Sequence, residues 1–231
     1  MNQSDTGFDD YAVDYDKALD RGISVSGETK EYFARSRVVW LAQCLEQLRE
    51  KPTLIMDYGC GTGSSTPFFL SSFPGASFVG IDVSPKSLDV ARQTTGRHST
   101  KFLLFDHYNP CAEIDLAFSS GVFHHIPPSE RPSAVQYIRR ALRPGGYFAL
   151  WENNPWNPGT RYVMSRIPFD REAIPLSYRQ AHRLLRAEGF TIMSTDFLFL
   201  FPRALRALRG LEPLLSKLPL ASQYQVLCRK I

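Results

Sequence analysis

The sequence predicts an α/β fold with a doubly wound, mainly parallel sheet. Two observations predict it. Segments with the pattern of buried strands alternate with segments of helical pattern from residue 53 to the C-terminus, and turn or capping residues mark the boundaries between them. Such alternation favours parallel strands connected by helices that cover both faces of a sheet. With 231 residues, of which 43% are hydrophobic, the chain can bury one substantial core.

The N-terminal part is expected to be helical. Residues 29–51 place apolar side chains at three- and four-residue steps, and Pro52 ends that pattern. We therefore expect residues 1–52 to form an N-terminal helical cap and residues 53–231 to form the core domain.

Within the core, strands and helices follow one another in order. Strands are expected at residues 53–58, 77–82, 101–105, 114–119, 147–152, 190–201 and 223–229. Helices are expected from about residue 64, over 84–94, from 129 to 142 and over 178–188. Ser84 can cap the second of these helices with Pro85 at its first position, and Gly189 can close the last.

Two segments do not fit the simple alternation. Only about eight residues, 106–113, separate the third and fourth strands, and a parallel crossover usually needs about a dozen. A helix there must be a single turn or absent. Residues 153–175 are too long for a bare connection, and we expect a substrate-side loop insertion, because long loops in compact domains usually serve a site.

Composition excludes several classes of protein. No run of eighteen apolar residues predicts a transmembrane helix, and the acidic N-terminus lacks the apolar core of a signal peptide. The cysteines are scattered without a CxxC motif, which is typical of reduced cytoplasmic thiols: Cys44, Cys60, Cys111 and Cys228. The net charge of +4 is concentrated in an Arg-rich second half. No dense basic run is interleaved with aromatic residues, so nucleic acid is not an expected partner.

The glycine-rich turn DYGCGTG, residues 57–63, follows the first strand. It is not a P-loop, because no Lys follows Gly63, and it is not the dinucleotide pattern GxGxxG, because the third glycine comes one residue early. Asp57 would repel a pyrophosphate but can accept from an ammonium. Cys60 is a weak candidate nucleophile and fits better as a small spacer.

Acidic residues at the next two strand ends complete a candidate binding site. Asp82 lies 19 residues after Gly63 and can accept hydrogen bonds from both ribose hydroxyls. Asp106 follows Phe105 at the end of the third strand and can accept from the exocyclic amine of an adenine. A ligand with a carboxylate, a ribose and an adenine, but without a pyrophosphate, would suit this edge of the sheet.

Five ordered motifs carry a family resemblance: DYGCGTG, VGIDVS, FDHYN, IDLAFSSGVFHHIPP and LRPGGYFALWE. Together they resemble the class I S-adenosylmethionine-dependent methyltransferases, most of all the small-molecule branch that includes the quinone-biosynthesis enzymes. The resemblance covers residues 8–152. It implies a Rossmann-like sheet of seven strands in the order 3-2-1-4-5-7-6 with the seventh antiparallel. The short connection 106–113 departs from the fullest form of that fold.

The resemblance also implies which residues hold the cofactor, with S-adenosyl-L-homocysteine as the product and no metal. Tyr11 and Tyr15 resemble N-terminal aromatic residues that close over the cofactor. The other implied contacts are Asp57, Gly59, Cys60, Gly61, Gly63, Asp82, Val83, Phe105, Asp106, Ser119 and Ser120.

His124 and His125 follow the fourth strand, where the methyl acceptor should lie. A neutral imidazole there could take a proton from the acceptor. Adjacent histidines rarely point the same way, so at most one should face the acceptor, and either could instead be a packing residue. No third metal ligand is apparent near them in the sequence.

The segment WENNPWNPGTRY supplies amide, aromatic and cationic groups that suit an acceptor with rings or hydroxyls, such as a sugar or heteroaromatic compound. The alternative is a rigid Asn-Pro turn cluster. The candidate acceptor-binding residues are Glu152, Asn154, Trp156, Asn157, Arg161 and Tyr162.

Residues 202–220 place leucines on one side and arginines elsewhere. Such a stripe usually docks on its own sheet, and membrane contact is the less favoured interpretation.

The predicted function is methyl transfer from S-adenosylmethionine to a small molecule: O-, N- or C-methylation of a secondary metabolite, sugar or lipid-linked intermediate, by a cytoplasmic monomer or homodimer. The alternatives are a nicotinamide-dependent oxidoreductase and a catalytically silent S-adenosylmethionine-binding scaffold.

Overall fold

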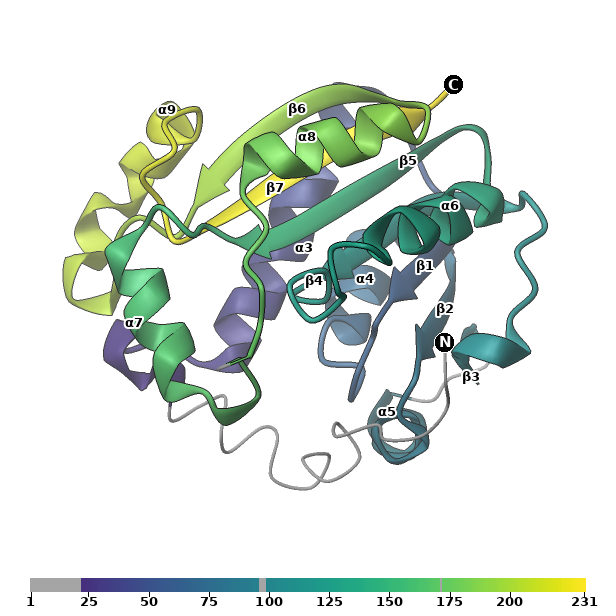
Figure 1. The fold of residues 1–231 in the computed structure, drawn as a ribbon, viewed down its shortest axis with the longest axis horizontal. Coiled ribbons are helices and arrows are strands. Elements are labelled where there is room, and N and C mark those ends of the chain that lie inside the picture. The colour runs from purple at the N-terminus through teal and green to yellow at the C-terminus, as the bar shows by residue number, and fades with distance from the viewer. Residues whose placement is uncertain (1–21, 96–98, 171) are drawn as a thin grey trace.

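The computed structural model describes residues 22–95, 99–170 and 172–231, which form a seven-stranded sheet in the order β3-β2-β1-β4-β5-β7-β6 (Figure 1). The predicted order is confirmed. The strands are β1 (Leu54–Tyr58), β2 (Ser77–Asp82), β3 (Thr100–Leu104), β4 (Ile114–Ser120), β5 (Leu142–Asn153), β6 (Phe190–Leu198) and β7 (Gln223–Lys230). Strands β1 to β5 pair in parallel, and β7 is antiparallel to both β5 and β6.

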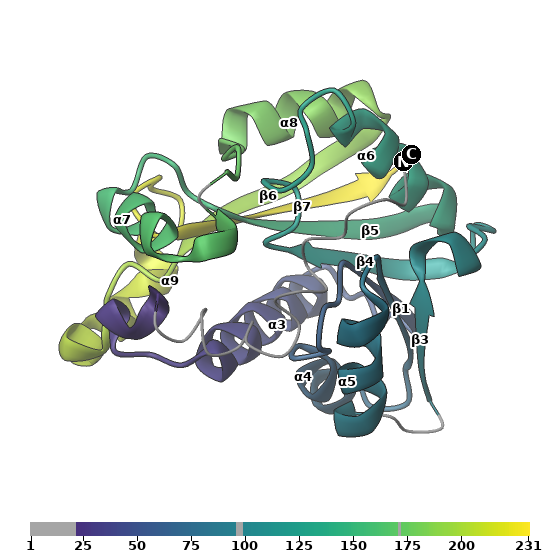
Figure 2. The same cartoon turned by 60° about the horizontal axis from the view of Figure 1, so that its bottom comes forward.

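Helices cover both faces of the sheet (Figure 2). They are α3 (Lys30–Gln47), α4 (Thr66–Ser72), α5 (Pro85–Thr95), α6 (Arg131–Ala141), α7 (Pro158–Arg166), α8 (Tyr178–Ala187) and α9 (Glu212–Leu215), with 3₁₀ turns η1 (Ser24–Ser26), η2 (Phe105–His107), η3 (Pro168–Asp170) and η4 (Arg203–Leu211). Helices α3, α4 and α5 bury side chains in the apolar cluster on one face, and α6 and α8 do so on the other. The doubly wound prediction is therefore confirmed.

Helix α3 shows how local sequence and packing agree. The Thr29 side chain accepts a hydrogen bond from the backbone N–H of Tyr32 and caps the helix start. Val38, Leu41 and Leu45 recur on one side of the helix and are fully buried in the core cluster shared with β1 and α4. A boundary at residue 52 between a cap and a core remains a prediction.

Three connections differ in detail from the sequence prediction. Helix α4 begins at Thr66 rather than directly after the glycine turn. Strand β5 begins at Leu142, and residues 143–146 are an irregularity in its pairing with β4 rather than a turn that precedes the strand. Strand β6 ends at Leu198, short of the predicted residue 201. The connection from β3 to β4 holds only the 3₁₀ turn η2, which agrees with the expected single turn.

The predicted loop of residues 153–175 contains helix α7. Asn157 caps it by accepting a hydrogen bond from the backbone N–H of Thr160 at 2.9 Å, and Pro158 occupies the first helical position. The Asn-Pro cluster is therefore a helix start. Figures 1 and 2 place α7 beside the end of β5, together with η4 and α9.

Residues 202–220 do not dock fully on the sheet. Arg209 contacts the rest of the fold: its guanidinium pairs with Glu28 at 2.8 Å and lies 4.6 Å from the centre of the Tyr32 ring. Several leucines remain between 42% and 80% exposed, namely Leu205, Leu208, Leu211, Leu214, Leu218 and Leu220. Among the described helices, none is long and apolar enough to cross a membrane.

Candidate functional site

Two cavities open at the carboxyl edge of the parallel strands. The glycine-turn cavity, of about 550 Å³, lies over the ends of β1 and β2 and along α6. The loop cavity, of about 380 Å³, lies between the end of β5, α7 and the N-terminal part of α3. Ser120, Gly121 and His125 line both cavities, so the two spaces meet directly after β4.

The glycine turn is held against β2 by backbone hydrogen bonds. The N–H groups of Gly59 and Cys60 both donate to the carbonyl of Ile81, and Gly61 N–H donates to the Asp82 carboxylate at 2.8 Å. Gly59 has a φ of +77°, and an added Cβ there would lie 2.5 Å from the Val122 side chain. A Cβ on Gly61 would meet no described atom within 4 Å, so this glycine leaves its side of the cavity open.

Two acidic side chains stand at this edge in different surroundings. Asp82 lines the cavity, and its second carboxylate oxygen accepts from the backbone N–H of Ser84 at 2.9 Å. Asp57 is 3% exposed and lies beneath the turn rather than on the cavity wall. Burial, together with the neighbouring Asp82 carboxylate, raises the pKa of Asp57 to about 8. The Arg37 charge opposes this rise and does not cancel it.

Six of the thirteen predicted cofactor residues line the glycine-turn cavity. Gly59, Gly61, Asp82, Val83, Phe105 and Ser120 line it. Gly63 packs instead toward α5, where an added Cβ would lie 3.1 Å from the Ala91 side chain. Ser119 is fully buried in β4, and its hydroxyl has no hydrogen-bond partner in the described part of the chain. Tyr11 and Tyr15 lie outside the described residues.

Cys60 and Asp106 stand away from the cavity surface. The Cys60 thiol is buried, and burial raises its pKa well above the usual value, which agrees with a spacer rather than a nucleophile. Asp106 is exposed on η2, while the preceding Phe105 lines the cavity and stacks on Tyr137 with ring centres 4.2 Å apart.

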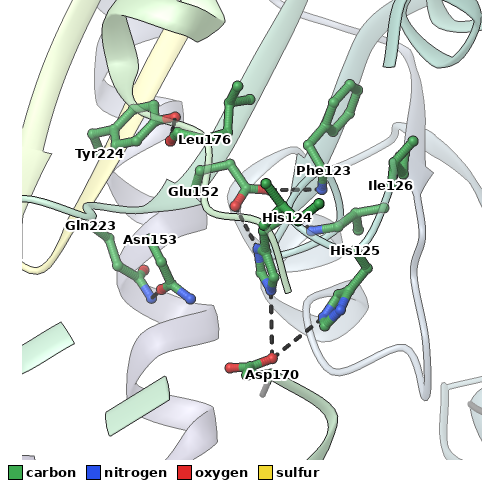
Figure 3. A network of polar contacts seen from close by, with 12 residues as sticks. Phe123, His124, His125, Ile126, Glu152, Asn153, Asp170, Leu176, Gln223 and Tyr224 are labelled. Carbon is green, nitrogen blue, oxygen red and sulfur yellow. Dashed lines mark hydrogen bonds and ion pairs between the residues drawn. The ribbon is translucent and has the colours of Figure 1, made fainter. Parts of the chain in front are cut away.

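At the far side of the shared wall, two histidines and two carboxylates form a buried cluster (Figure 3). Glu152, near the end of β5, accepts from the backbone N–H of Phe123 at 2.8 Å and contacts His124 Nδ1 at 2.6 Å. Asp170 Oδ1 lies 3.6 Å from His124 Nε2 and 3.4 Å from His125 Nε2. The carboxylate of Asp170 thus faces both imidazole rings.

The surroundings shift the pKa values of His124 and His125 in opposite directions. Burial disfavours the charged form of His124, but Glu152 and Asp170 outweigh burial and raise its pKa to about 10. Burial and the charge on His124 lower the pKa of His125 to about 4. Burial raises the pKa of Glu152, but the His124 charge and the hydrogen bonds that Glu152 accepts outweigh it and hold that pKa below its ordinary value. At pH 7, His124 is therefore a cation and His125 is neutral.

The expectation that adjacent histidines point apart is wrong. The ring centres of His124 and His125 are 4.1 Å apart, and both side chains line the loop cavity. The reason is local backbone geometry: both residues lie in a tight turn, in which His125 N–H donates to the Val122 carbonyl, rather than in an extended strand.

The rest of the turn is fixed from two directions. The guanidinium of Arg131, on α6, donates to the carbonyls of Phe123, Ile126 and Ile174. Ile174 N–H in turn donates to the His124 carbonyl at 2.8 Å. Sequence reasoning missed Asp170, which supplies beside the histidines a third side chain of a type that can ligate a metal. Its only signal was an acidic residue inside a long polar insertion.

The predicted acceptor residues divide into two groups. Glu152, Asn157 and Tyr162 line the loop cavity. Asn154 is buried away from the cavity, where its amide donates to the Pro219 and Ala221 carbonyls, and Arg161 is exposed outside the cavity wall. Sequence reasoning missed much of the wall, which comes from distant segments and includes Tyr32, Phe33, Arg37, Trp151, Phe201 and Gln223.

Trp156, the remaining predicted acceptor residue, also lies outside the cavity wall. Its ring is 46% exposed and packs edge-on against Tyr178, with the Arg179 guanidinium 5.2 Å from its centre.

Comparison with known proteins gives a family match over part of the chain. Residues 56–148 match the methyltransferase domain family. Trans-aconitate 2-methyltransferase of Azoarcus sp. is 29% identical over 114 residues, which cover 49% of this chain and 44% of that protein. An uncharacterized methyltransferase of Synechocystis sp. is 34% identical over 112 residues, which cover 46% and 50%. The chain thus spans about half the length of the curated relatives that it matches.

Solved structures agree on the fold. The plantazolicin methyltransferase BamL, in complex with a triazolic desmethylPZN analog and S-adenosylhomocysteine, superposes with a TM-score of 0.65 at 16% identity, covering 93% of this chain and 90% of that one. An S-adenosylmethionine-dependent methyltransferase of Mesorhizobium loti gives a TM-score of 0.58 at 20% identity, covering 78% and 91%. The family match over residues 56–148 and the observed strand order agree with the resemblance to the class I S-adenosylmethionine-dependent methyltransferases.

Proposed function

We propose that the protein transfers a methyl group from S-adenosylmethionine to a small molecule bound in the loop cavity. The observation that carries the proposal is the contact between the two cavities at Ser120, Gly121 and His125. A cofactor in the glycine-turn cavity and an acceptor in the loop cavity would meet there, beside the imidazole of His125.

The residues of the glycine-turn cavity fit the cofactor. Its volume lies in the range of small-molecule sites, of about 300–1,000 Å³. Asp82 supplies a carboxylate that can accept from ribose hydroxyls in addition to its two backbone donors, since a carboxylate has about four acceptor sites. Val83, Phe105 and Ile126 supply apolar wall for an adenine ring, and the open side of Gly61 leaves room for a ligand.

Asp57 fits a cationic ligand. Its carboxyl is buried, and burial together with the neighbouring Asp82 charge raises its pKa. A positive ligand charge close by would favour the ionised form. We propose that Asp57 acts on the ammonium of the cofactor across the turn, directly or through water.

When bound, S-adenosylmethionine supplies an electrophilic methyl group, so the transfer needs no covalent intermediate on the protein. The chain's own residues bind and orient the two reactants. His125 presents a neutral imidazole at the junction, where it can hold an acceptor hydroxyl or amine in line and receive its proton. His124 is locked between Glu152 and Asp170 and positions its neighbour.

The walls of the loop cavity suggest the class of acceptor. Aromatic faces of Tyr32, Phe33 and Trp151 stand opposite polar groups of Asn153 and Gln223. This mixture suits a compact ring compound with hydroxyl or amine groups, such as a heteroaromatic metabolite or a sugar. We propose a biosynthetic methylation of such an acceptor by a cytoplasmic monomer or homodimer.

Two measurements test the proposed function. Calorimetric titration with S-adenosylhomocysteine should give one site per chain, while NADH should not bind. Radiolabelled methyl transfer onto fractionated extract of the source cell should label a small molecule. A protein that binds S-adenosylhomocysteine but labels no fraction would favour the silent scaffold. Tight NADH binding without a response to S-adenosylhomocysteine would favour the oxidoreductase.

A further inference from the structure

The cluster of His124, His125 and Asp170 has the composition of a metal site. One ligand atom from each residue lies within 4.8 Å of the others. Two imidazoles and one carboxylate are a common set for first-row divalent cations, with the remaining positions open to substrate or water. His124 and Asp170 are buried, and His125 is nearly buried. Side chains of these types are more often exposed on protein surfaces.

The distances in the cluster suit a shared ion better than direct hydrogen bonds. Asp170 Oδ1 lies 3.6 Å and 3.4 Å from the Nε2 atoms of His124 and His125, which is longer than a good N–H···O bond. Two atoms that each lie about 2.1 Å from a tetrahedral ion are about 3.4 Å apart. These two separations therefore match ligands arranged around one small cation, and the three ligand atoms all lie within 4.8 Å of one another.

Glu152 is not one of the three clustered residues, but it contacts one of them, His124, and orients its ring. It contacts His124 Nδ1 at 2.6 Å, which leaves Nε2 directed toward Asp170. Metal-bound histidines almost always donate their second ring N–H to a carboxylate or carbonyl, because this fixes the tautomer and the ring orientation. The Phe123 N–H bond to Glu152 holds that carboxylate in place in turn.

The open side of the cluster faces the loop cavity, which all three side chains line. A divalent cation bound there would place positive charge beside the buried carboxylates of Glu152 and Asp170, where an acceptor oxygen would lie.

We propose that His124, His125 and Asp170 bind one divalent transition-metal cation of the Zn²⁺ type, and that its open positions hold an oxygen or nitrogen atom of the methyl acceptor. The acceptor role rests on the proposed function, whereas metal binding itself does not. With the ion bound, His125 is a ligand and no longer receives the acceptor's proton; the ion would instead lower the pKa of the acceptor group, whose proton leaves to solvent. The imidazole ligands favour Zn²⁺, Co²⁺ or Ni²⁺ over Mg²⁺, which prefers carboxylates and water. The ion would hold the acceptor group beside the junction with the glycine-turn cavity.

Metal binding is tested on the full chain after treatment with a chelator. Calorimetric titration with Zn²⁺, and with Co²⁺ followed by its visible absorption, should show one ion per chain with a Kd in the micromolar range or tighter. Mg²⁺ should show no comparable binding. The absence of Zn²⁺ and Co²⁺ binding, or a Co²⁺ spectrum without nitrogen ligands, would overturn the proposal.

Substitutions locate the ion. Asp170→Asn removes the carboxylate charge and should weaken Zn²⁺ binding about 100-fold or more, and His125→Asn should do the same. Glu152→Gln should weaken it about 10- to 100-fold, because the amide N–H₂ would face Nδ1 and force the proton of His124 onto Nε2. His182→Gln is the matched control: His182 lies on α8 against Thr195, outside the cluster, and its loss should change nothing.

The variants also separate this inference from the proposed function. S-adenosylhomocysteine binding and thermal unfolding report whether each variant is folded, and His125→Asn replaces Asp170→Asn if the latter is not. Equal Zn²⁺ affinity in the wild type and in folded cluster variants would overturn the site, even if methyl transfer proceeds. Methyl transfer that chelation leaves unchanged would overturn the acceptor role, whereas loss on chelation and recovery with Zn²⁺ would support it.

Discussion

The two halves of the candidate site are built in different ways. At the ends of β1 and β2, Asp82 takes its partners from nearby segments, Gly61 and Ser84. At the ends of β4 and β5, His124 takes its partners from Glu152 and Asp170, 28 and 46 positions further along the chain. The first half joins the ends of two neighbouring strands, 21 positions apart at Gly61 and Asp82, whereas the second also needs a residue of the long insertion.

Their charges differ as well. Asp57 and Asp82 repel each other at the first half, and the pKa of Asp57 rises to about 8 as a result of burial and this repulsion. In the second half, Glu152 and Asp170 are matched by His124 and Arg131. Two carboxylates thus lie close together at the glycine turn, where a cationic ligand would favour their ionised forms, whereas in the histidine cluster the carboxylates already face a histidine.

The largest expected effect concerns the buried carboxyl of Asp57. Because the pKa of Asp57 is raised on folding, the folded protein holds a proton that the unfolded chain releases above about pH 4. The stability of the fold therefore declines as the pH rises from about 4 to about 8. Asp57→Asn should remove this decline. The difference in free energy of unfolding between pH 5 and pH 9 should shrink by on the order of 4 kcal/mol. Urea unfolding at both pH values measures it, and parallel pH profiles of variant and wild type would refute the charge assignment.

The second effect tests the junction of the cavities. His125→Ala should lower kcat for methyl transfer about 100-fold or more while the Kd for S-adenosylhomocysteine stays unchanged. The reason is that His125 lines both cavities but offers no anion to the cofactor. His182→Ala serves as the control. An active His124→Ala, His125→Ala double variant would remove both histidines from the reaction.

The third effect concerns Asp82 at the glycine turn. Asp82→Ala should lose about 1.5–3 kcal/mol of cofactor binding, because charge-assisted hydrogen bonds are lost. The substitution also frees the Gly61 and Ser84 N–H groups, so Asp82→Asn, which keeps an acceptor oxygen, is the matched variant. Calorimetry with S-adenosylhomocysteine measures both. Near-normal affinity in Asp82→Ala would contradict the ribose assignment.

The smallest effect compares two aromatic residues of the insertion. Tyr162 lines the loop cavity and Trp156 does not, although both are about half exposed. Tyr162→Ala should raise the KM for the acceptor by an amount equivalent to about 1 kcal/mol of lost apolar contact, and Trp156→Ala should not. Steady-state kinetics with a labelled acceptor measures the KM of both variants. A KM change confined to Trp156→Ala would mean that the acceptor binds outside the loop cavity.

Sequence reasoning succeeded wherever the signal was local. Strand β2 has the predicted bounds, helix α5 follows Ser84 and Pro85 as expected, and the strand order agrees with the resemblance. It was less accurate where local signals compete. The Asn-Pro cluster that resembled a turn is the start of α7, because Asn157 both favours turns and caps helices.

The alternation of strands and helices, the glycine turn and the acidic strand ends could be predicted from the residues alone, because backbone conformation and parallel pairing bring the carboxyl ends of strands to one edge. Packing, in contrast, brings His124 and His125 into one cavity, adds Asp170 to them and leaves Trp156 outside. These contacts depend on how an insertion packs across the end of β5, and residues 46 positions apart leave no periodic trace in a sequence.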